Sequence, residues 1–286
     1  MARTPPGRQA GARRPALRGL LLQGLVSCLV PLTACGTVDP PTTPAASRSS
    51  LSPGAAPATA SPGRAPSGTL RGLTVVLDPG HNGANGGHPA EINRPVPTGR
   101  GGTKACDTTG TSTNAGYPEH AFAWDVALRV RDALTARGVR VVLTRPDDAG
   151  VGPCVNDRAA IANRAGADAK VSIHADGAAP SGHGFHVAYS APPLNPSQGR
   201  PSVDLANALA GALRGSGFSA ADYIGSGGLY PRSDLAGLNL SQIPAVLVEC
   251  ANMRNPEEAA LVSTPQGRAR YAAAIAKGIM AWLTSR

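Results

Sequence analysis

Leu73-Thr-Val-Val-Leu77 is a short apolar run, and Asp78-Pro-Gly-His81 follows it directly. Short apolar runs bounded by Gly, Pro and Asp are typical of strands that are buried on both faces of a parallel sheet. In open α/β sheets, the ligand crevice lies outside the carboxyl ends of such strands. The pattern therefore predicts a buried strand that delivers His81 to the ligand-binding edge of a sheet.

Two later segments have the same form. Lys170-Val-Ser-Ile173 leads into His174, and Pro244-Ala-Val-Leu-Val248 leads into Glu249. Because the carboxyl ends of parallel strands meet at one edge, we expect both side chains to lie near His81.

Between these runs, apolar residues recur at helical spacing, so strands and helices alternate along the chain. This alternation predicts one α/β domain with a mixed, mostly parallel twisted sheet of about six strands, flanked by helices on both faces.

We expect the segment from His81 to Tyr117, which is rich in Gly and Pro, to be a long loop without regular structure. Residues 223–239 are expected to form a glycine-rich loop or an irregular hairpin. Strands are expected near 73–77, 139–143, 170–173, 184–189 and 245–248, and helices near 118–137, 157–166, 201–215, 255–262 and 265–284.

Residues 1–34 have the pattern of a signal peptide. Five arginines precede an apolar stretch near residues 19–32, which is too short to span a membrane comfortably. The stretch ends in Leu32-Thr-Ala-Cys35, which resembles a bacterial lipobox and predicts that Cys35 is lipidated. The alternative is an ordinary cleavage site with a chance cysteine. Arg13-Arg14 also resembles part of a twin-arginine export signal.

Residues 35–70 are rich in Pro, Ser, Thr, Ala and Gly and contain few large apolar side chains. Such a segment cannot bury enough surface to offset its ordering entropy, so we predict a disordered tether that leads to a folded domain at 71–286.

The net charge of +9 overstates the charge of this domain. Seven of the 27 basic residues and one of the 18 acidic residues precede residue 71, which leaves a balance near +3. That balance and an aromatic content of 3% speak against nucleic-acid binding. We expect a monomer.

The chain has five cysteines, and their positions suggest different roles. Cys28 would leave with the signal peptide. Cys106 and Cys154 lie in loop-like sequence, and export would place them in an oxidising compartment, so we expect a disulfide between them. The alternative is two partly buried free thiols. Cys250 follows a core strand and is expected to be a small buried residue.

The polar residues at the strand ends suggest a metal site. Catalytic zinc keeps three protein ligands and one open position, and two histidines with one glutamate are a known ligand set. His81, His174 and Glu119 would form that set, with Glu119 in the first turn of the helix that begins at Pro118. Glu249 ends an apolar strand, where a carboxylate without a partner is costly to bury, so it is a candidate general base.

Each of these residues has a structural alternative. His81 could be a turn residue and His174 a core histidine. Glu119 could be a favourable charge at a helix N-terminus, and Glu249 could belong to a structural ion pair.

An ordered set of motifs links these residues. The motifs are Val75-Val-Leu-Asp-Pro-Gly-His81-Asn, Leu143-Thr-Arg145 with Asp148, Arg158 with Ala162-Asn163, Ala167-Asp168, Val171-Ser-Ile-His174-Ala, and Pro244-Ala-Val-Leu-Val-Glu249 with Asn252 and Asn255. Together they resemble the zinc-dependent N-acetylmuramoyl-L-alanine amidases of the amidase 3 family. Lys104-Ala-Cys-Asp107 and Asn252-Met-Arg-Asn255 resemble the actinobacterial, mycobacterial-type members most.

The resemblance implies a site and a substrate. It implies Zn²⁺ on His81, Glu119 and His174, with Glu249 as the catalytic glutamate, and Asp176 and Asn252 as substrate contacts. The implied substrate is peptidoglycan, cut at the amide between the lactyl group of N-acetylmuramic acid and L-alanine. The alternatives are another zinc-dependent cell-wall peptidase and a catalytically silent wall-binding protein.

The expected location follows from the leader. We expect an exported protein at the outer face of the cytoplasmic membrane or in the cell wall, attached through the lipid on Cys35. The alternative is a secreted soluble protein.

Overall fold

A computed structural model describes residues 70–286 of the chain. The expected signal peptide, the lipidation site Cys35 and all but the last residue of the expected tether lie outside the described residues. Within 70–286, no helix is both long enough and apolar enough to cross a lipid bilayer.

A six-stranded sheet forms the centre of the domain, in the order β4-β1-β5-β8-β6-β7. The four strands β4, β1, β5 and β8 are mutually parallel, whereas β6 is antiparallel to β8 and parallel to β7. The predicted mixed, mostly parallel sheet is confirmed. The strands are β1 (Thr74–Pro79), β4 (Arg140–Leu143), β5 (Ala169–Asp176), β6 (His186–Ser190), β7 (Leu229–Arg232) and β8 (Ala245–Asn252).

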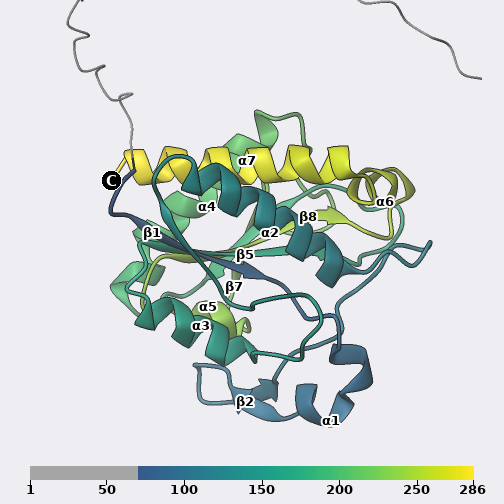
Figure 1. Cartoon of the computed structure of the whole chain (residues 1–286), viewed down its shortest axis with the longest axis horizontal. Coiled ribbons are helices and arrows are strands. Elements are labelled where there is room, and N and C mark those ends of the chain that lie inside the picture. Colours follow the sequence, from purple (N-terminus) through teal and green to yellow (C-terminus); the bar gives the residue numbers. More distant parts are fainter. Residues whose placement is uncertain (1–69) are drawn as a thin grey trace, which may run out of the picture. The chain divides into compact units, whose positions relative to one another are not determined.

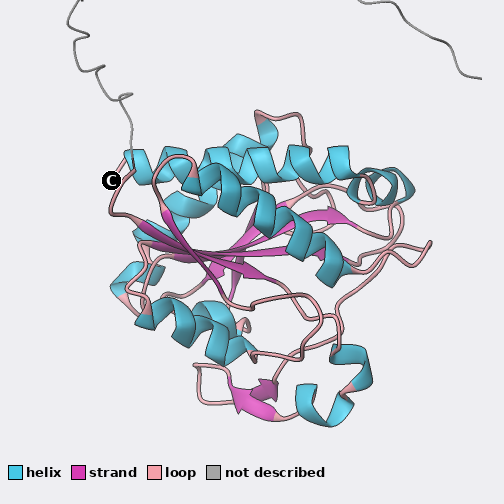
Figure 2. Cartoon of the chain, viewed as in Figure 1, coloured by secondary structure: helices cyan, strands magenta, loops and turns pink. Residues whose placement is uncertain are grey.

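Helices cover both faces of this sheet, as Figures 1 and 2 show. On one face lie α2 (Glu119–Thr135), α4 (Arg200–Arg214) and α7 (Pro265–Thr284), with the short α6 (Pro256–Val262) beside α7. The other face carries α3 (Val155–Arg164) and α5 (Ala236–Asn239). Because both faces are covered, the central strands are mostly apolar, although β5 also contains the buried polar residues Lys170 and Ser172.

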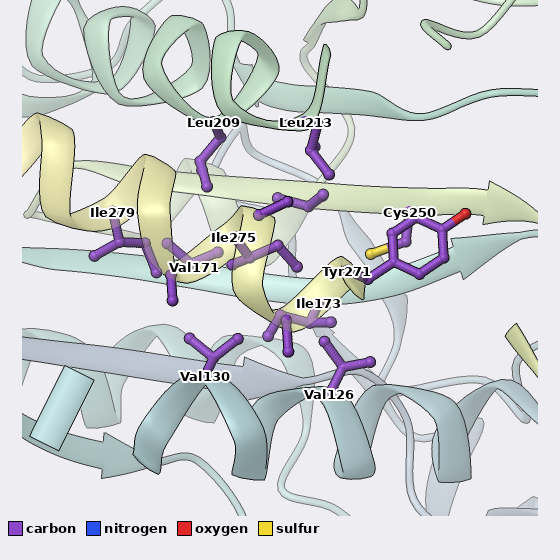
Figure 3. Close-up of a cluster of buried hydrophobic side chains, with 14 of the residues drawn as sticks. Val126, Val130, Val171, Ile173, Leu209, Leu213, Cys250, Tyr271, Ile275 and Ile279 are labelled. Atoms are coloured by element: carbon purple, nitrogen blue, oxygen red, sulfur yellow. The ribbon is translucent and has the colours of Figure 1, made fainter. Parts of the chain in front are cut away.

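The main core lies between the sheet and the three long helices. Figure 3 shows α7 between α2 and α4, with Ile275 and Ile279 near Val171 of β5. These side chains are completely buried. Full burial of an aliphatic side chain stabilises a fold by about 1.5–3 kcal/mol, so this layer holds the central strands in a defined position.

The register of the central strands brings the predicted site residues together. His174 of β5 is the register partner of Glu249 of β8. The backbone N–H of Gly80, one residue after β1, donates to the carbonyl of Ile173 at 2.9 Å. The ends of β1, β5 and β8 therefore lie side by side.

Two segments expected to be loops contain short regular elements. The segment after β1 holds a 3₁₀ turn η1 (Asn85–Gly87), the helix α1 (Pro89–Ile92) and an antiparallel hairpin of β2 (Pro95–Pro97) and β3 (Thr103–Ala105). The expectation of no regular structure there was wrong. Elements of three or four residues are too short to show a hydrophobic period, and the prolines at both ends of β2 argue against a strand on sequence grounds. β7 and α5 lie within the second segment, 223–239.

Candidate functional site

His81, Glu119 and His174 meet at the carboxyl edge of the sheet. One ligand atom from each lies within 4.8 Å of the others. Glu119 Oε1 is 2.8 Å from His174 Nδ1 and 3.2 Å from His81 Nε2. Ligands bound tetrahedrally about 2.0–2.1 Å from one zinc ion would be separated by roughly 3.3 Å. The three side chains therefore have the donor types of a zinc site, and the two distances from Glu119 are near the spacing that such a site requires.

The backbone next to His81 lies very close to the imidazole of His174. His81 has φ of 58°, in the left-handed region that non-glycine residues seldom adopt. Gly80 precedes it, and a Cβ atom at that position would lie 2.2 Å from Cε1 of His174. Only glycine can therefore stand at position 80 while the imidazole of His174 remains in place.

Glu119 is the first residue of α2 and is buried. Its Oε2 accepts a hydrogen bond from the backbone N–H of Thr111 at 2.9 Å. Burial by itself would raise the pKa of Glu119, but His81 and hydrogen bonds from both histidines lower it well below its usual range. The surroundings of Glu119 thus favour its ionised form, which can bind a cation.

A second carboxylate lies behind His81. Asp107 Oδ1 is 3.2 Å from His81 Nδ1, and the same nitrogen lies 3.1 Å from the carbonyl of Thr108. Burial lowers the pKa of His81, but Glu119 and Asp107 outweigh this effect and raise it to about 10. The pKa reports an excess of negative charge around the imidazole, which a bound metal cation would neutralise.

Arg158 of α3 connects this carboxylate to the sheet. Its guanidinium lies 3.3 Å from Asp107 and 2.9 Å from Asp78, and it donates to the carbonyl of His81 at 3.0 Å. Arg158 is buried together with both carboxylates. One side chain therefore positions the backbone of His81 and the acid behind its ring.

Asp78, at the end of β1, is the centre of a buried polar network. It contacts Lys170 Nζ at 2.9 Å and accepts hydrogen bonds from Ser172 and Thr144, each at 2.7 Å. Burial would raise the pKa of Asp78, but Lys170 and Arg158 lower it well below its usual value. The network ties β1, β4, β5 and α3 together beneath the site.

Sequence reasoning did not assign functions to Asp107 or Lys170. Asp107 follows Cys106 in a loop, and no periodicity marks it. Lys170 was included in an apolar strand. A buried lysine in such a strand requires a carboxylate partner, and this requirement was the available signal.

Glu249 lies on β8, next to His174 in the sheet register. Its Oε2 is buried and has no hydrogen-bond partner among residues 70–286. Burial, together with the nearby carboxylates of Glu119 and Asp176, raises the pKa of Glu249 well above its usual value. An unpartnered carboxyl oxygen with a raised pKa in a cavity is typical of a group that transfers protons.

The two residues expected to contact substrate differ in their surroundings. Asp176 lines the cavity and accepts hydrogen bonds from Tyr223 Oη at 3.1 Å and from the backbone of Gly177 at 2.7 Å. Asn252 is fully buried. Its Oδ1 accepts from the backbones of Ala178 and Arg254, and its Nδ2 donates to two carbonyls of the loop after β5. The expectation that Asn252 contacts substrate does not fit this geometry, because all its polar atoms hold the loop.

The cysteines border the same region. Cys106 and Cys154 form a disulfide, and their Cα atoms are 4.5 Å apart. Cys106 immediately precedes Asp107, and Cys154 is the N-cap residue of α3, the helix that carries Arg158. Cys250 is a buried free thiol.

These residues surround a cavity of about 750 Å³. The three candidate ligands, Glu249 and Asp176 all line it. A cavity of this size is within the range that takes a small ligand or part of a polymer.

The sequence model of the N-acetylmuramoyl-L-alanine amidase family, amidase 3, matches residues 75–281. The chain belongs to this family.

Individual relatives agree with the family match. The N-acetylmuramoyl-L-alanine amidase Rv3717 of Mycobacterium tuberculosis is 54% identical over 217 residues, covering 76% of this chain and 89% of the relative. The crystal structure of the N-acetylmuramyl-L-alanine amidase Ami1 from Mycobacterium smegmatis is 57% identical with a TM-score of 0.74, covering 76% of this chain and all of that one. Ami1 from Mycobacterium abscessus is 54% identical with a TM-score of 0.73, covering 74% and 99% of the two chains. The predicted family and the predicted enzyme class, a peptidoglycan hydrolase, are confirmed.

Proposed function

We propose that this amidase uses zinc held by His81, Glu119 and His174 to cut the bond between the lactyl group of N-acetylmuramic acid and L-alanine, with Glu249 as the general base. The observation that carries the proposal is the meeting of two imidazole nitrogens and one carboxylate oxygen within 4.8 Å, next to a glutamate whose Oε2 has no other partner in the described domain.

The metal and the glutamate would have separate tasks. A zinc ion bound by these residues would act as a Lewis acid, which would lower the pKa of bound water to about 7 and polarise the amide carbonyl. Glu249 accepts a proton from the attacking water and then delivers it to the nitrogen of L-alanine as the C–N bond breaks. The products are a lactyl carboxylate and a free amine. Burial and the neighbouring carboxylates raise the pKa of Glu249, and a carboxylate with a raised pKa is a stronger proton acceptor than an ordinary one.

The surrounding residues would hold the reacting groups in place. Asp107 accepts the Nδ1 proton of His81 and leaves Nε2 as the ligand atom that faces Glu119. Arg158 holds Asp107, and the buried network of Asp78 holds Arg158. We expect Asp176 to contact substrate, because it lines the same cavity as Glu249.

Digestion of purified peptidoglycan tests this function. We expect stem peptides with a free N-terminal L-alanine and glycan strands that retain lactyl carboxylates, both identified by mass spectrometry. A zinc chelator should stop their release, and added zinc should restore it. Cuts within the stem peptide would identify a wall peptidase instead, and binding to the wall without any product would identify a catalytically silent protein.

We also propose that the amidase acts outside the cytoplasmic membrane as a monomer attached through a lipid on Cys35. The support is the sequence Leu32-Thr-Ala-Cys35, which follows an apolar stretch and an arginine-rich start. Residues 35–70 would then tether the domain to the membrane surface and allow it to reach the wall. The alternative remains a secreted soluble enzyme.

A further inference from the structure

Arg254 is a cation on the wall of the active-site cavity without a countercharge. It follows β8 by two residues and is half-buried. Its Nη1 donates one hydrogen bond, to Asn114 Oδ1 at 3.1 Å, and among residues 70–286 it forms no ion pair. A guanidinium has five N–H donors, so most of them remain available to a ligand.

The other lysines and arginines on the cavity wall differ from Arg254. Arg158 and Lys170 are buried and already paired with carboxylates. Lys104, on β3, is half-buried and forms no ion pair within the described domain. Among the described lysines and arginines that line the cavity, Lys104 and Arg254 are therefore the two that can offer a free positive charge to a molecule there.

Of the two cations, Arg254 is the one whose backbone is connected to the central sheet. Its backbone N–H donates to Asn252 Oδ1 at 3.0 Å, and the N–H of the preceding Met253 donates to the carbonyl of Asp176 at 2.8 Å. Asp176 is the last residue of β5, the strand that carries His174. The backbone of Arg254 is thus fastened to the end of a strand that supplies a candidate metal ligand. Lys104 instead lies on the short hairpin of β2 and β3.

The substrate has its charge on one side of the bond that is cut. On the sugar side, muramic acid carries hydroxyl and N-acetyl groups and no charge while its lactyl group is amidated. On the peptide side, the acidic residues that follow L-alanine carry free carboxylates, unless these are amidated. A planar guanidinium binds a carboxylate through two parallel hydrogen bonds, which a lysine cannot reproduce.

We propose that Arg254 forms a subsite for a carboxylate of the stem peptide. The subsite would bind the peptide side of the amide that is cut, because that side carries the negative charge. The inference rests on the proposed function, because it assumes that the muramoyl–alanine amide is the bond that is cut. It identifies Arg254 as a specificity residue and not as a participant in the bond-breaking step.

Synthetic muramoyl tripeptides test the subsite. Three substrates are compared by kcat/KM: one with free carboxylates at the second and third residues, one with a carboxamide at the second, and one with a carboxamide at the third. For the wild-type domain we expect one of the two amidations to lower kcat/KM about tenfold, since a hydrogen bond to a charged group contributes this much. The position that is sensitive identifies the carboxylate that Arg254 binds.

The variants are Arg254→Gln and, as a matched control, Lys104→Gln. We expect Arg254→Gln to lower kcat/KM about tenfold on the fully charged substrate, mainly through KM, and to abolish the preference against the sensitive carboxamide. Arg254→Lys should recover only part of that preference. Lys104→Gln should keep it in full. Zinc content and the circular dichroism spectrum of Arg254→Gln should match those of the wild type.

Three results would overturn the subsite. The wild type could cut all three substrates equally well, Arg254→Gln could slow all three by the same factor, or Lys104→Gln could be the variant that loses the preference. Failure of the proposed function would look different, because the wild-type domain would then release no free L-alanine amine from any of the three substrates.

Discussion

Asp107 Oδ1 lies 3.2 Å from Nδ1 of His81, while Nε2 of the same ring faces Glu119. A histidine that donates its proton from Nδ1 presents a lone pair at Nε2. Asp107 and the carbonyl of Thr108, which lies 3.1 Å from the same nitrogen, therefore both favour the tautomer in which the cavity side of the ring can bind a metal ion. Arg158 fixes Asp107 in turn, at 3.3 Å.

We predict that Asp107→Asn weakens zinc binding about 10- to 100-fold while the domain remains folded, because the amide no longer provides a negative charge behind the ligand. Competition with a chromophoric chelator measures the affinity. Asp132→Asn, at an exposed position on α2, is the matched control and should bind zinc normally. His174→Ala should lose most of the metal. Equal affinities for the two aspartate variants would refute the role of Asp107.

Glu249→Gln should retain both zinc and fold but lose activity about 10²- to 10⁴-fold, since it keeps the shape of the side chain and removes the proton acceptor. Release of stem peptides from purified wall gives the activity, and elemental analysis gives the zinc content. Turnover within a few-fold of the wild type in a zinc-loaded variant would show that another group moves the proton.

Loss of the Cys106–Cys154 disulfide should lower stability and weaken the site. The crosslink spans a sequence separation of 48 residues, and the chain-entropy model assigns such a loop about 4 kcal/mol at most. Because the bridge joins the residue before Asp107 to the start of the helix that carries Arg158, we expect reduction to lower activity more than zinc content. The Cys106→Ala/Cys154→Ala variant should have the same low activity with and without reductant. If reduction leaves the wild type fully active, the bridge has no role at the site.

Stability should fall in mild acid because of His186. Burial lowers its pKa from 6.5 to about 4, against an opposing effect of Asp176 and with a small contribution from Arg232. The folded state thus favours the neutral ring. The contribution of His186 to the free energy of unfolding is therefore complete above pH 6.5 and is lost as the pH falls toward 4. Between pH 7 and pH 5 the loss should be about 2 kcal/mol.

Urea unfolding of the wild type and of His186→Gln at the two pH values isolates this effect, since protonation of the metal ligands affects both proteins alike. The variant should lose less stability on acidification. His183→Gln, at an exposed position, should behave as the wild type does. Identical losses for wild type and His186→Gln would rule out this histidine as the cause.

Cys35→Ala should move the full-length protein from the membrane fraction to the soluble fraction, because acyl chains would supply the membrane affinity. Cell fractionation with immunodetection measures the distribution. Cys250→Ala is the control, since Cys250 is buried in the domain and should not affect attachment. An unchanged membrane fraction in Cys35→Ala would mean that something other than a lipid holds the protein there.

The sequence by itself determined the central strands and the fold class. β1, β5 and β8 lie between two layers of helices and are largely buried, so each leaves a readable run of mostly apolar residues, although β5 also buries Lys170 and Ser172. A polar residue that ends such a run, or follows it within a few positions, is exceptional in that context. His81, His174 and Glu249 could therefore be selected from the amino-acid pattern alone, and the ordered motifs supplied the family.

Tertiary structure alone decided how these side chains face one another. A shift of one residue between β5 and β8 would turn every side chain to the other face, and the sequence does not specify that register. The observed register pairs His174 with Glu249. The loop from His81 to Glu119 brings Asp107 behind His81, although 26 positions separate them in the sequence.

The same reason explains why the sequence does not show whether Arg158, Lys170 and Arg254 are paired with carboxylates. Whether a charged side chain is paired or free depends on which groups lie within a few ångströms of it, and those groups come from distant parts of the chain. Arg158 and Lys170 have carboxylate partners, whereas the guanidinium of Arg254 has only Asn114 among residues 70–286. Hydrophobic periodicity records which face of an element is buried. It carries no information about contacts between polar groups on different elements, so those contacts became visible only in the folded domain.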